Sequence, residues 1–444
     1  MSLKHNALAD FCLGASLLLV AALAGCAPAA PAPGGSAGAA PARSEAKGQA
    51  TVASLDAAPP TAATPSAAEA IPSAASLTPE ELTDGWIALF DGESLFGWKA
   101  SSKADWRVEQ GAIVVTSGDK GLLCTTAQFS NYVLKVDFRS AERTNSGIFL
   151  HTPLEMGDPA KDCYEVNVAP PDNPFPTGSL VQRQKAAGRF DSDQWQSCEV
   201  TVQDDRVTVK LDGRAVAQYA DPRPLRRGHV GLQFNEGRVE FRNIRLKPLG
   251  LASLFNGKDL TGWKTYPDLP TRSSVTAEGY LNIKNGRGPL ETENRFGDFV
   301  LQLECMTHAA NLNSGVFFRC LPGPDMNGYE SQIHNGFKDG DRNRAFDCGT
   351  GGIFRRIDAR RVVADDLTWF HKTIVVDGPH VAVWVNGYQV TDWTDDRKPD
   401  ENPRKGLRLA SGTIMLQGHD PTTDISFRNL RIAEMPVRGT PEAK

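Results

Sequence analysis

One short stretch of the sequence combines the residue types that proton transfer requires. Glu330, Gln332 and His334 alternate with less polar residues. Because side chains alternate across a β-strand, these three would share one face of a sheet. A second stretch places Gln417 and His419 on one face in the same way. A carboxylate beside two imidazoles is typical of general acid–base catalysis, so we predict a catalytic site formed by these segments.

A third segment adds a cation to this set. In an expected strand over residues 315–320, Phe317 and Arg319 point to the face opposite Val316 and Phe318. If the polar faces of the three segments meet, the Arg319 guanidinium would stabilise a developing anion. Asn313, just ahead of the strand, is a candidate substrate ligand.

The alternative is a solvated sheet face. Antiparallel sheets commonly keep one face wet, and such faces carry charged and amide residues without any function. For each residue taken singly this alternative is favoured. Taken together, these polar residues favour a functional site, because two of the eight histidines fall on short strands beside glycine-rich sequence. Four of these glycines would let a ligand approach the backbone: Gly315, Gly351, Gly352 and Gly418.

The chain contains this pattern twice. Leu-Phe-Asp-Gly at 89–92 and Leu-Phe-Asn-Gly at 254–257 are each followed by Gly-Trp-Lys, and Phe-Arg-Asn recurs at 241–243 and 427–429. Solenoid units run to only about 20–50 residues, so a repeat this long indicates a duplicated domain. Polar residues that both copies share can therefore be separated from those that only one copy has.

The first copy keeps part of the polar set. Glu165 matches Glu330, Gln233 matches Gln417, and His151 stands at the position of Arg319. Asn167 replaces Gln332, while Ala169 and Asn235 replace the two histidines. We predict that the second copy holds the active site, with Glu330, His334, His419 and Arg319 catalytic and Gln332, Gln417 and Asn313 binding substrate. In the first copy Glu165, His151 and Gln233 are predicted substrate ligands; His151 could also act as a base, which leaves its activity open.

Strands must position these residues, because helical periodicity is scarce. Turn pairs such as Asp212-Gly213 and Asn386-Gly387 separate short alternating runs and suit hairpins. The runs in the first copy are 132–139, 147–151, 199–203, 207–212, 230–234 and 239–246; those in the second are 299–305, 315–320, 372–376, 381–386, 413–417 and 425–432. Many short strands and few helices predict an all-β protein with one antiparallel β-sandwich in each copy.

The N-terminal segments predict export. Residues 1–26 combine a weakly basic start, a short apolar run and Leu-Ala-Gly-Cys, which resembles a bacterial lipobox with Cys26 as the lipidated residue. The alternative is an ordinary secretory signal. Residues 27–76 are rich in Ala, Pro, Gly, Ser and Thr and predict a disordered tether. We therefore expect a lipid-anchored protein of the bacterial cell envelope, periplasmic or surface-exposed.

Composition limits the classes of ligand and partner that we expect for this protein. The net charge is −5, and no basic cluster interleaves with aromatic residues, so nucleic acid is not an expected partner. Six cysteines lie beyond Cys26 with no CxxC motif, which disfavours a cysteine zinc site. Disulfides can persist in an exported protein, but sequence order does not pair these cysteines.

Together, the motifs resemble the 3-keto-disaccharide hydrolase domain family. The matching segments in the second copy are 254–263, 313–319, 328–333, 416–419 and 427–429. The resemblance covers residues 84–248 and 249–435, more strongly in the second copy, and implies a concanavalin A-like jelly-roll in each. It also implies cleavage of glycosides oxidised at C3, by hydrolysis or by elimination and rehydration. In that chemistry Glu330 or His334 would be the base and His419 the general acid.

Three alternatives remain open at this stage. No cofactor is required, although a divalent metal held by Glu330 and a histidine could replace Arg319 as the electrophile. The protein could instead be a carbohydrate-binding surface lipoprotein that breaks no bond, with Trp369, Trp384 or Trp393 stacking on sugar rings. A purely structural or adhesive lipoprotein would show no response to sugars. The expected ligand is an oligosaccharide or an oxidised glycoside.

Overall fold

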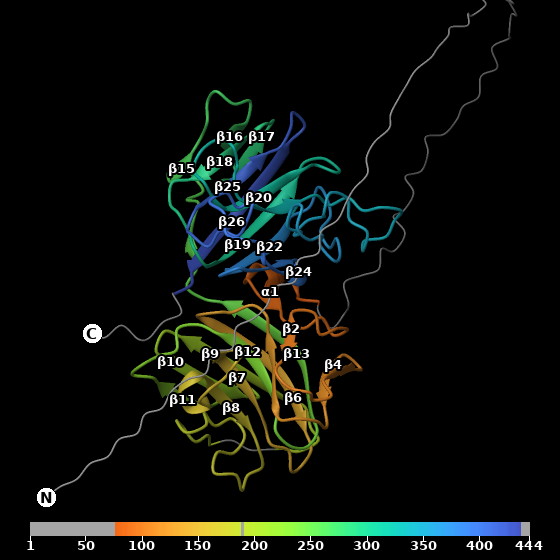
Figure 1. The fold of residues 1–444 in the computed structure, drawn as a ribbon, viewed down its shortest axis with the longest axis vertical. Coiled ribbons are helices and arrows are strands. Elements are labelled where there is room, and N and C mark those ends of the chain that lie inside the picture. The colour runs from red at the N-terminus through yellow and green to blue at the C-terminus, as the bar shows by residue number, and fades with distance from the viewer. Residues whose placement is uncertain (1–75, 188–190, 437–444) are drawn as a thin grey trace, which may run out of the picture. The chain divides into compact units, whose positions relative to one another are not determined.

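The computed structural model describes residues 76–187 and 191–436 (Figure 1). The predicted signal peptide, Cys26 and most of the predicted linker lie outside the described residues. None of the helices in the described part of the chain is long and apolar enough to cross a membrane. The two helices with assigned bounds are short: α1 (Pro79–Thr83) and α2 (Pro159–Asp162).

The first copy contributes thirteen strands. They are β1 (Ile87–Ala88), β2 (Trp98–Ala100), β3 (Arg107–Glu109), β4 (Ala112–Val115), β5 (Gly121–Thr125), β6 (Tyr132–Ser140), β7 (Ser146–Thr152), β8 (Tyr164–Val168), β9 (Gln196–Gln203), β10 (Arg206–Leu211), β11 (Arg214–Ala220), β12 (His229–Phe234) and β13 (Val239–Pro248). One sheet has the order β11-β10-β9-β6-β13-β4-β3, with β1 also paired to β13, and the other has the order β2-β5-β12-β7-β8.

The second copy repeats this arrangement. Its strands are β14 (Ala252–Ser253), β15 (Trp263–Lys264), β16 (Arg272–Val275), β17 (Leu281–Lys284), β18 (Gly288–Thr292), β19 (Phe299–Thr307), β20 (Ser314–Cys320), β21 (Tyr329–Ile333), β22 (Phe370–Asp377), β23 (His380–Val385), β24 (Tyr388–Thr394), β25 (Thr413–Gly418) and β26 (Asp424–Glu434). The larger sheet runs β24-β23-β22-β19-β26-β17-β16, with β14 on β26, and the smaller runs β15-β18-β25-β20-β21.

The strand order matches element for element between the copies, and each copy pairs an eight-stranded sheet with a five-stranded one. The predicted fold class is therefore confirmed: two tandem jelly-roll β-sandwiches. Both predicted hairpins form, because Asp212-Gly213 and Asn386-Gly387 adopt positive φ at both positions. The short strands that precede the long ones in each copy, such as β2 and β15, were missed, because runs of two or three residues carry no readable alternation.

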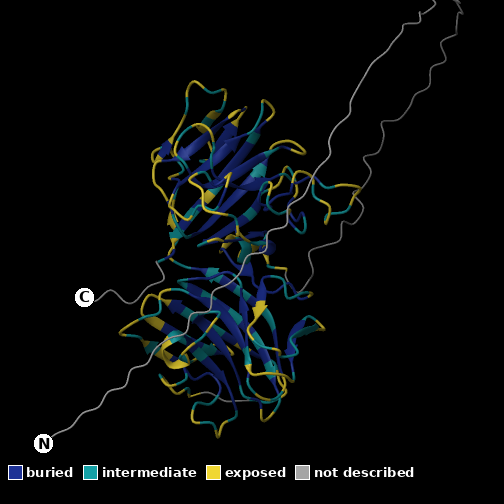
Figure 2. Cartoon of the chain, viewed as in Figure 1, coloured by how far each residue is buried: buried dark blue, intermediate teal, exposed yellow. Residues whose placement is uncertain are grey.

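Alternation sorts the residues of each sheet between core and outer face. In the second copy Val316 and Phe318 of β20, Tyr329 and Ile333 of β21 and Leu416 of β25 all belong to the buried apolar core. Strands are largely buried and exposed residues gather in the connecting loops (Figure 2). The residues between these positions must then face outward from the five-stranded sheet.

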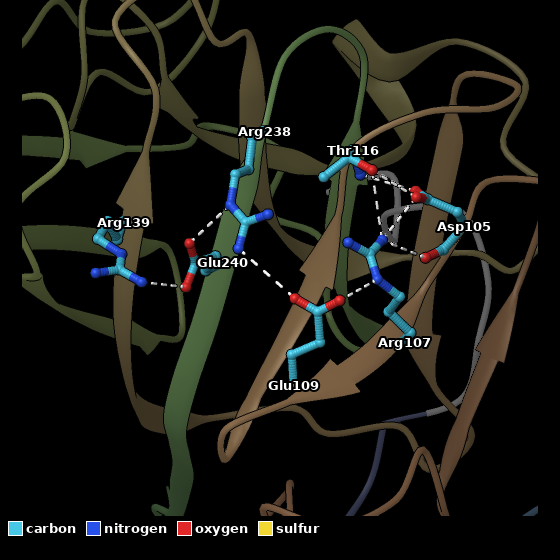
Figure 3. Close-up of polar contacts among 7 residues, drawn as sticks. All are labelled: Asp105, Arg107, Glu109, Thr116, Arg139, Arg238 and Glu240. Carbon is cyan, nitrogen blue, oxygen red and sulfur yellow. Dashed lines mark hydrogen bonds and ion pairs between the residues drawn. The ribbon is translucent and has the colours of Figure 1, made fainter.

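The eight-stranded sheet of the first copy shows what a structural polar face looks like (Figure 3). Arg139 and Arg238 both bind the Glu240 carboxylate, with N–O distances of 2.7 and 2.9 Å, and Arg107 bridges Glu109 and Asp105 at 2.5 and 2.6 Å. Every charge in this network has an opposite partner. Such a face is satisfied without a ligand.

All six cysteines of the described residues are buried free thiols. Burial raises the pKa of five of them to about 12, and that of Cys320 well above its ordinary value. Because the thiolate is the reactive form, these thiols are structural core residues.

Candidate active site

The outer face of the five-stranded sheet in the second copy brings most of the predicted polar residues together. Phe317 of β20 lies opposite Glu330 of β21, and Gly315 lies opposite Gln332. Gln417 of β25 has the same parity as Met415, which lies opposite Phe317. Glu330, Gln332 and Gln417 thus share one face, as the alternation predicted.

Glu330 is the most unusual group on this face. The residue is 7% exposed, and its carboxylate makes no hydrogen bond or ion pair with any described residue. Burial raises the pKa of Glu330 to about 7, although the charges of Arg404 and Lys372 act in the opposite direction. A cavity of about 70 Å³ lined in part by Glu330, Arg355 and Arg404 lies beside it. A buried, unpartnered carboxyl that titrates near neutrality is suited to accept a proton.

Gly315 makes the position of Glu330 possible. A Cβ atom at residue 315 would lie 2.7 Å from Glu330 Oε1 and 2.9 Å from its Cγ, so the carboxylate occupies the space that a side chain would fill. At the other three glycines, protein atoms already occupy the space that a side chain would need. These atoms belong to Val390 beside Gly351, to the Cys348 carbonyl beside Gly352, and to the Asn285 carbonyl and Thr271 beside Gly418. The prediction that these glycines admit a ligand to the backbone is therefore wrong.

Gly315→Ala should displace the Glu330 carboxylate while leaving the fold intact, because the three atoms nearest to the new methyl group all belong to the flexible Glu330 side chain. We expect turnover to fall about 10- to 100-fold, the usual effect of misplacing a catalytic group by about 1 Å. Gly147→Ala is the matched control, since its Cβ would lie 2.8 Å from Glu165 Oε1 in the first copy. Steady-state rates and thermal melts of both variants provide the measurement; an equal loss of rate in both would contradict the assignment to the second copy.

Asp347 joins the site from the loop after β21. Its Oδ2 accepts hydrogen bonds from Gln332 Nε2 at 2.8 Å and from Asn313 Nδ2 at 2.5 Å. Gln332 and Asn313 are thus held in place, while Asn313 Oδ1 and Gln417 Oε1 are buried without a partner. Nothing in the sequence pattern indicated Asp347, because it lies in a loop whose path only the fold defines.

The hydrogen bonds of His334 define its tautomer. Its Nδ1 lies 3.2 Å from the backbone N–H of Gly336, which can only donate, so Nδ1 is the acceptor and Nε2 carries the proton. Burial lowers the pKa of His334, against the opposing charges of Asp347 and Asp366. A neutral imidazole with Nε2–H is a hydrogen-bond donor, so this geometry favours Glu330 over His334 as the base.

His419 pairs with the residue that follows it. Its Nδ1 lies 2.8 Å from Asp420 Oδ2, and Thr422 binds the other oxygen of Asp420 through its backbone N–H at 2.8 Å. Because a carboxylate oxygen can only accept, Nδ1 donates this bond, which orients the imidazole and leaves Nε2 as the nitrogen available to a ligand. Asp420 was not among the predicted residues, although its position directly after His419 was a usable signal.

A buried lysine supports the strand that carries these residues. Lys372 of β22 is 1% exposed, and its Nζ donates to the carbonyls of Ser331 and Gln332 at 2.9 and 2.7 Å. Burial lowers the pKa of Lys372 to about 8. The corresponding residue of the first copy is Cys198, so this support belongs to the second copy alone.

Arg319 is not part of the site, which corrects the prediction. A bulge at the end of β20 shifts the register, so that Cys320 rather than Arg319 continues the face of Phe317. Arg319 has a φ of 50° and is 1% exposed. Its guanidinium binds Asp298 Oδ1 at 2.6 Å and the carbonyls of Gly378 and Arg408 at 2.6 and 3.1 Å. These buried hydrogen bonds indicate that Arg319 has a structural role.

Arg319→Met should destabilise the protein by about 3 kcal/mol, because it leaves buried carbonyl groups and part of the Asp298 carboxylate unsatisfied. Arg355→Met is the control for stability, since the Arg355 side chain is exposed and its guanidinium forms no hydrogen bond or ion pair within the described residues. Denaturant unfolding of both variants measures the difference. A loss of activity in Arg319→Met without a loss of stability would return Arg319 to the site.

The first copy repeats the carboxylate but not its surroundings. Burial raises the pKa of Glu165 to about 7, and Gln233 Oε1 is buried without a partner, so both resemble their counterparts. His151 does not fit its predicted binding role. Its two ring nitrogens lie 2.8 and 2.6 Å from the carbonyls of Leu225 and Ser130, and burial lowers its pKa to about 4. Its φ of 52° shows the same bulge as at Arg319.

Of the three tryptophans proposed as sugar platforms, Trp384 is buried, whereas Trp369 and Trp393 are half-buried and remain candidates. Trp384 is 1% exposed. Trp369 packs edge-on against Tyr280, with the Arg428 guanidinium 4.1 Å from its ring centre, and Trp393 packs against Tyr329. Among the described residues, no group of three or more His, Cys, Asp or Glu side chains is placed to hold a metal ion. A divalent metal in the role of Arg319 stays a prediction.

Comparison with known families identifies the two sandwiches. The model of the 3-keto-α-glucoside-1,2-lyase-like domain matches the chain twice, at residues 85–247 and 250–433. The chain belongs to this family. Membership of the 3-keto-α-glucoside-1,2-lyase-like family confirms the resemblance seen in the motifs and supports a carbohydrate-active enzyme of the hydrolase type with sugar ligands.

Individual relatives match smaller parts of the chain. The 3-keto-disaccharide hydrolase of Bacteroides thetaiotaomicron is 30% identical over 95 residues, which cover 19% of this chain and 32% of that protein. The chain thus matches about a third of the length of that relative. A candidate glycosyl hydrolase from Parabacteroides distasonis is 26% identical, with a TM-score of 0.34 and coverage of 42% of this chain and 100% of its own. The carbohydrate-binding module CBM66 of Bacillus subtilis is 18% identical, with a TM-score of 0.28 and coverage of 34% and 95%.

Proposed function

We propose that the second sandwich cleaves glycosides that carry a ketone at C3, beginning with removal of the C2 proton. The observation that carries this proposal is Glu330, a buried carboxylate with no partner and a pKa raised to about 7 by burial. Both copies have such a carboxylate, but only the second also carries His334 and His419 at the ends of β21 and β25, further along the same sheet.

The chemistry follows from the ketone. A C3 ketone acidifies the proton on C2, and Glu330 takes this proton to leave an enediolate. Collapse of the enediolate expels the oxygen substituent on C1 and gives a C1–C2 double bond. Addition of water, with hydroxide to C1 and a proton to C2, completes a net hydrolysis; release of the unsaturated ketone before this step would make the reaction an elimination.

The remaining residues divide the other tasks. The Nε2–H of His334 donates a hydrogen bond to the enediolate oxygen, where charge develops. His419 delivers a proton from Nε2 to the departing C1 oxygen while Asp420 stabilises its imidazolium form. Gln417 and Asn313, each with an unpaired buried oxygen, accept hydrogen bonds from sugar hydroxyls. Glu165 and Gln233 offer similar contacts in the first copy.

The first test is release of a chromogenic leaving group from a 3-keto-glucoside by the full chain, with the unoxidised glucoside as control. Because the base must be a carboxylate, kcat/KM should rise about tenfold per pH unit below pH 7 and level off above it. A profile that is flat from pH 5 to 8 would exclude Glu330 as the base. No release, together with saturable sugar binding, would favour the carbohydrate-binding alternative.

The cellular setting is part of the same proposal. A lipid on Cys26 would hold the two sandwiches at the bacterial cell envelope through a long tether, where they would meet extracytoplasmic glycosides. Replacement of Cys26 by Ala should release the protein from the membrane fraction, which immunoblotting of fractionated cells would measure.

A further inference from the structure

The first copy contains a cavity of about 630 Å³ that is lined mainly by cationic side chains. Its walls come from α2, from the loop after β8 and from the connection between β11 and β12. The volume lies within the range of about 300–1,000 Å³ that is usual for ligand pockets. Five cations and two carboxylates are in the lining: Lys161, Arg183, Arg223, Arg226 and Arg227, with Asp162 and Asp221. The mechanism proposed for the second copy uses none of these residues.

A tyrosine marks the same place in both copies. In the first copy the Tyr164 hydroxyl donates to Asp221 Oδ2 at 2.8 Å and accepts from the backbone N–H of Leu225 at 3.0 Å. The Tyr329 hydroxyl makes the same pair of bonds in the second copy, to an aspartate and from a backbone N–H. The surroundings of the two tyrosines can therefore be compared directly.

In the second copy the chain itself fills the space that is open in the first. Residues 222–224 separate the two partners of Tyr164, whereas the much longer segment 396–407 separates those of Tyr329. Pro403 and Arg404 of this segment line the cavity that remains beside Tyr329, which has a volume of only about 70 Å³. The large cavity is thus a property of the first copy, produced by its shorter connection.

Two of the cations in the lining already have partners. Lys161 Nζ lies 2.7 Å from Asp158 Oδ2, and Arg227 binds two carboxylates outside the cavity at N–O distances of 2.7 and 3.3 Å. The carboxylates of the lining accept from backbone N–H groups instead, Asp162 at 2.7 Å and Asp221 at 2.9 Å. Within the described residues, neither carboxylate forms an ion pair with the remaining arginines.

Three arginines of the lining are left without a carboxylate partner: Arg183, Arg223 and Arg226. Arg183 is held in place, because its Nη2 donates to the Ala160 carbonyl at 2.9 Å and its guanidinium lies 4.8 Å from the centre of the Tyr164 ring. Arg223 and Arg226 are exposed, and their guanidiniums form no hydrogen bond or ion pair in the part of the chain that the structure describes. Unpaired guanidiniums in a cavity favour an anionic ligand, because arginine binds carboxylates through two parallel hydrogen bonds.

We propose that this cavity binds an acidic saccharide, with a uronate carboxylate held by Arg183, Arg223 and Arg226. The arginines account for the negative charge of the ligand, and membership of a carbohydrate-active family supports a sugar. Tyr219 and Pro222 in the same lining offer apolar surface to the C–H face of the sugar ring. The site lies in the copy that lacks both histidines, so it gives that copy a binding role of its own.

The test is calorimetric titration of the full chain with trigalacturonate, with its neutral methyl ester and with inorganic phosphate. We expect saturable binding of trigalacturonate that weakens as NaCl is raised, because salt screens the attraction between exposed charges. The ester and phosphate should bind at least about tenfold more weakly. Arg223→Met and Arg226→Met should each weaken trigalacturonate binding about 3- to 10-fold, and the double variant more. Arg214→Met, at an exposed arginine of the first copy outside the cavity, is the matched control and should bind as the wild type does.

Three results would overturn the proposal: no binding of trigalacturonate, equal binding of its ester, or equal binding by the double variant. Phosphate binding as tight as that of trigalacturonate would show an adventitious anion site only, which also overturns it. Turnover of a 3-keto-glycoside reports separately on the proposed function, and the arginine variants should leave it unchanged. A chain that binds trigalacturonate through these arginines but cleaves no 3-keto-glycoside would retain the acidic-saccharide site and lose the proposed function.

Discussion

Glu330→Gln is expected to lower the turnover of a 3-keto-glycoside by about 10²- to 10⁴-fold, because the amide cannot accept the C2 proton. The change preserves shape and adds no charge, so the fold should be kept. Glu165→Gln is the matched control, since Glu165 occupies the same strand position, lies over the corresponding glycine and has the same raised pKa of about 7. We expect that control to retain turnover within a few-fold.

The same variant should be more stable than the wild type at high pH. The folded pKa of Glu330 is about 7, above the ordinary value of 4.5. The folded state therefore binds more protons than the unfolded state between these values, and stability falls as pH rises from about 4.5 to 7. Removing the carboxylate should recover on the order of 1–3 kcal/mol at pH 8 and little at pH 4. Denaturant unfolding at both pH values measures this, and a variant that is less stable at pH 8 would show that Glu330 has a stabilising partner.

His419→Ala is expected to lower turnover by about 10²- to 10⁴-fold when the leaving group is a sugar alcohol, which departs only if protonated. With a nitrophenolate leaving group, which needs no proton, the loss should be much smaller. This difference between leaving groups separates a general acid from a residue that merely holds the fold. Asn235→Ala, at the corresponding position of the first copy, is the matched control.

Asp420→Asn should reproduce part of the His419→Ala effect. The amide keeps a hydrogen bond to Nδ1 but no longer stabilises the imidazolium, so the loss should again be larger for the poorer leaving group. If His419→Ala only unfolds the second sandwich, or if both leaving groups are affected equally, His419 is not the acid. Thermal melts of the variants beside their rates decide between these outcomes.

The comparison of copies explains why one sandwich is favoured for catalysis. Both retain the glutamate, the glycine beneath it and the outward-facing glutamine, so these belong to the inherited architecture of the polar face. His334, His419 and Lys372 occur only in the second copy, as does the longer connection from His334 to Thr350, whereas Glu236 of the first copy stands at the position of Asp420. A face with one titratable carboxylate can bind a sugar, but the proposed reaction also needs an acid and a donor to the enediolate.

The sequence located the shared face of Glu330, Gln332 and Gln417, because alternation along a strand is a local property that neighbouring strands preserve. Alternation placed Arg319 on the wrong face of the sheet. A single bulge at the end of β20 shifts which residues face outward, and no residue type in the sequence signals that bulge. The glycines were misassigned for a different reason. What fills the space beside a glycine depends on the side chains of the neighbouring strand, and beside Gly315 it is the diagonal Glu330.

The sequence by itself determined the duplication, the all-β class and the copy that carries both histidines, since each depends on residue order or on the period of polar residues along a strand. The tertiary structure decided which charges are paired. It buried Glu330 without a partner, gave Arg319 four different acceptors, and brought Asp347 from a long loop to the edge of the sheet. Burial and pairing depend on residues far apart in the chain, and these set the pKa of a carboxylate and therefore its chemistry.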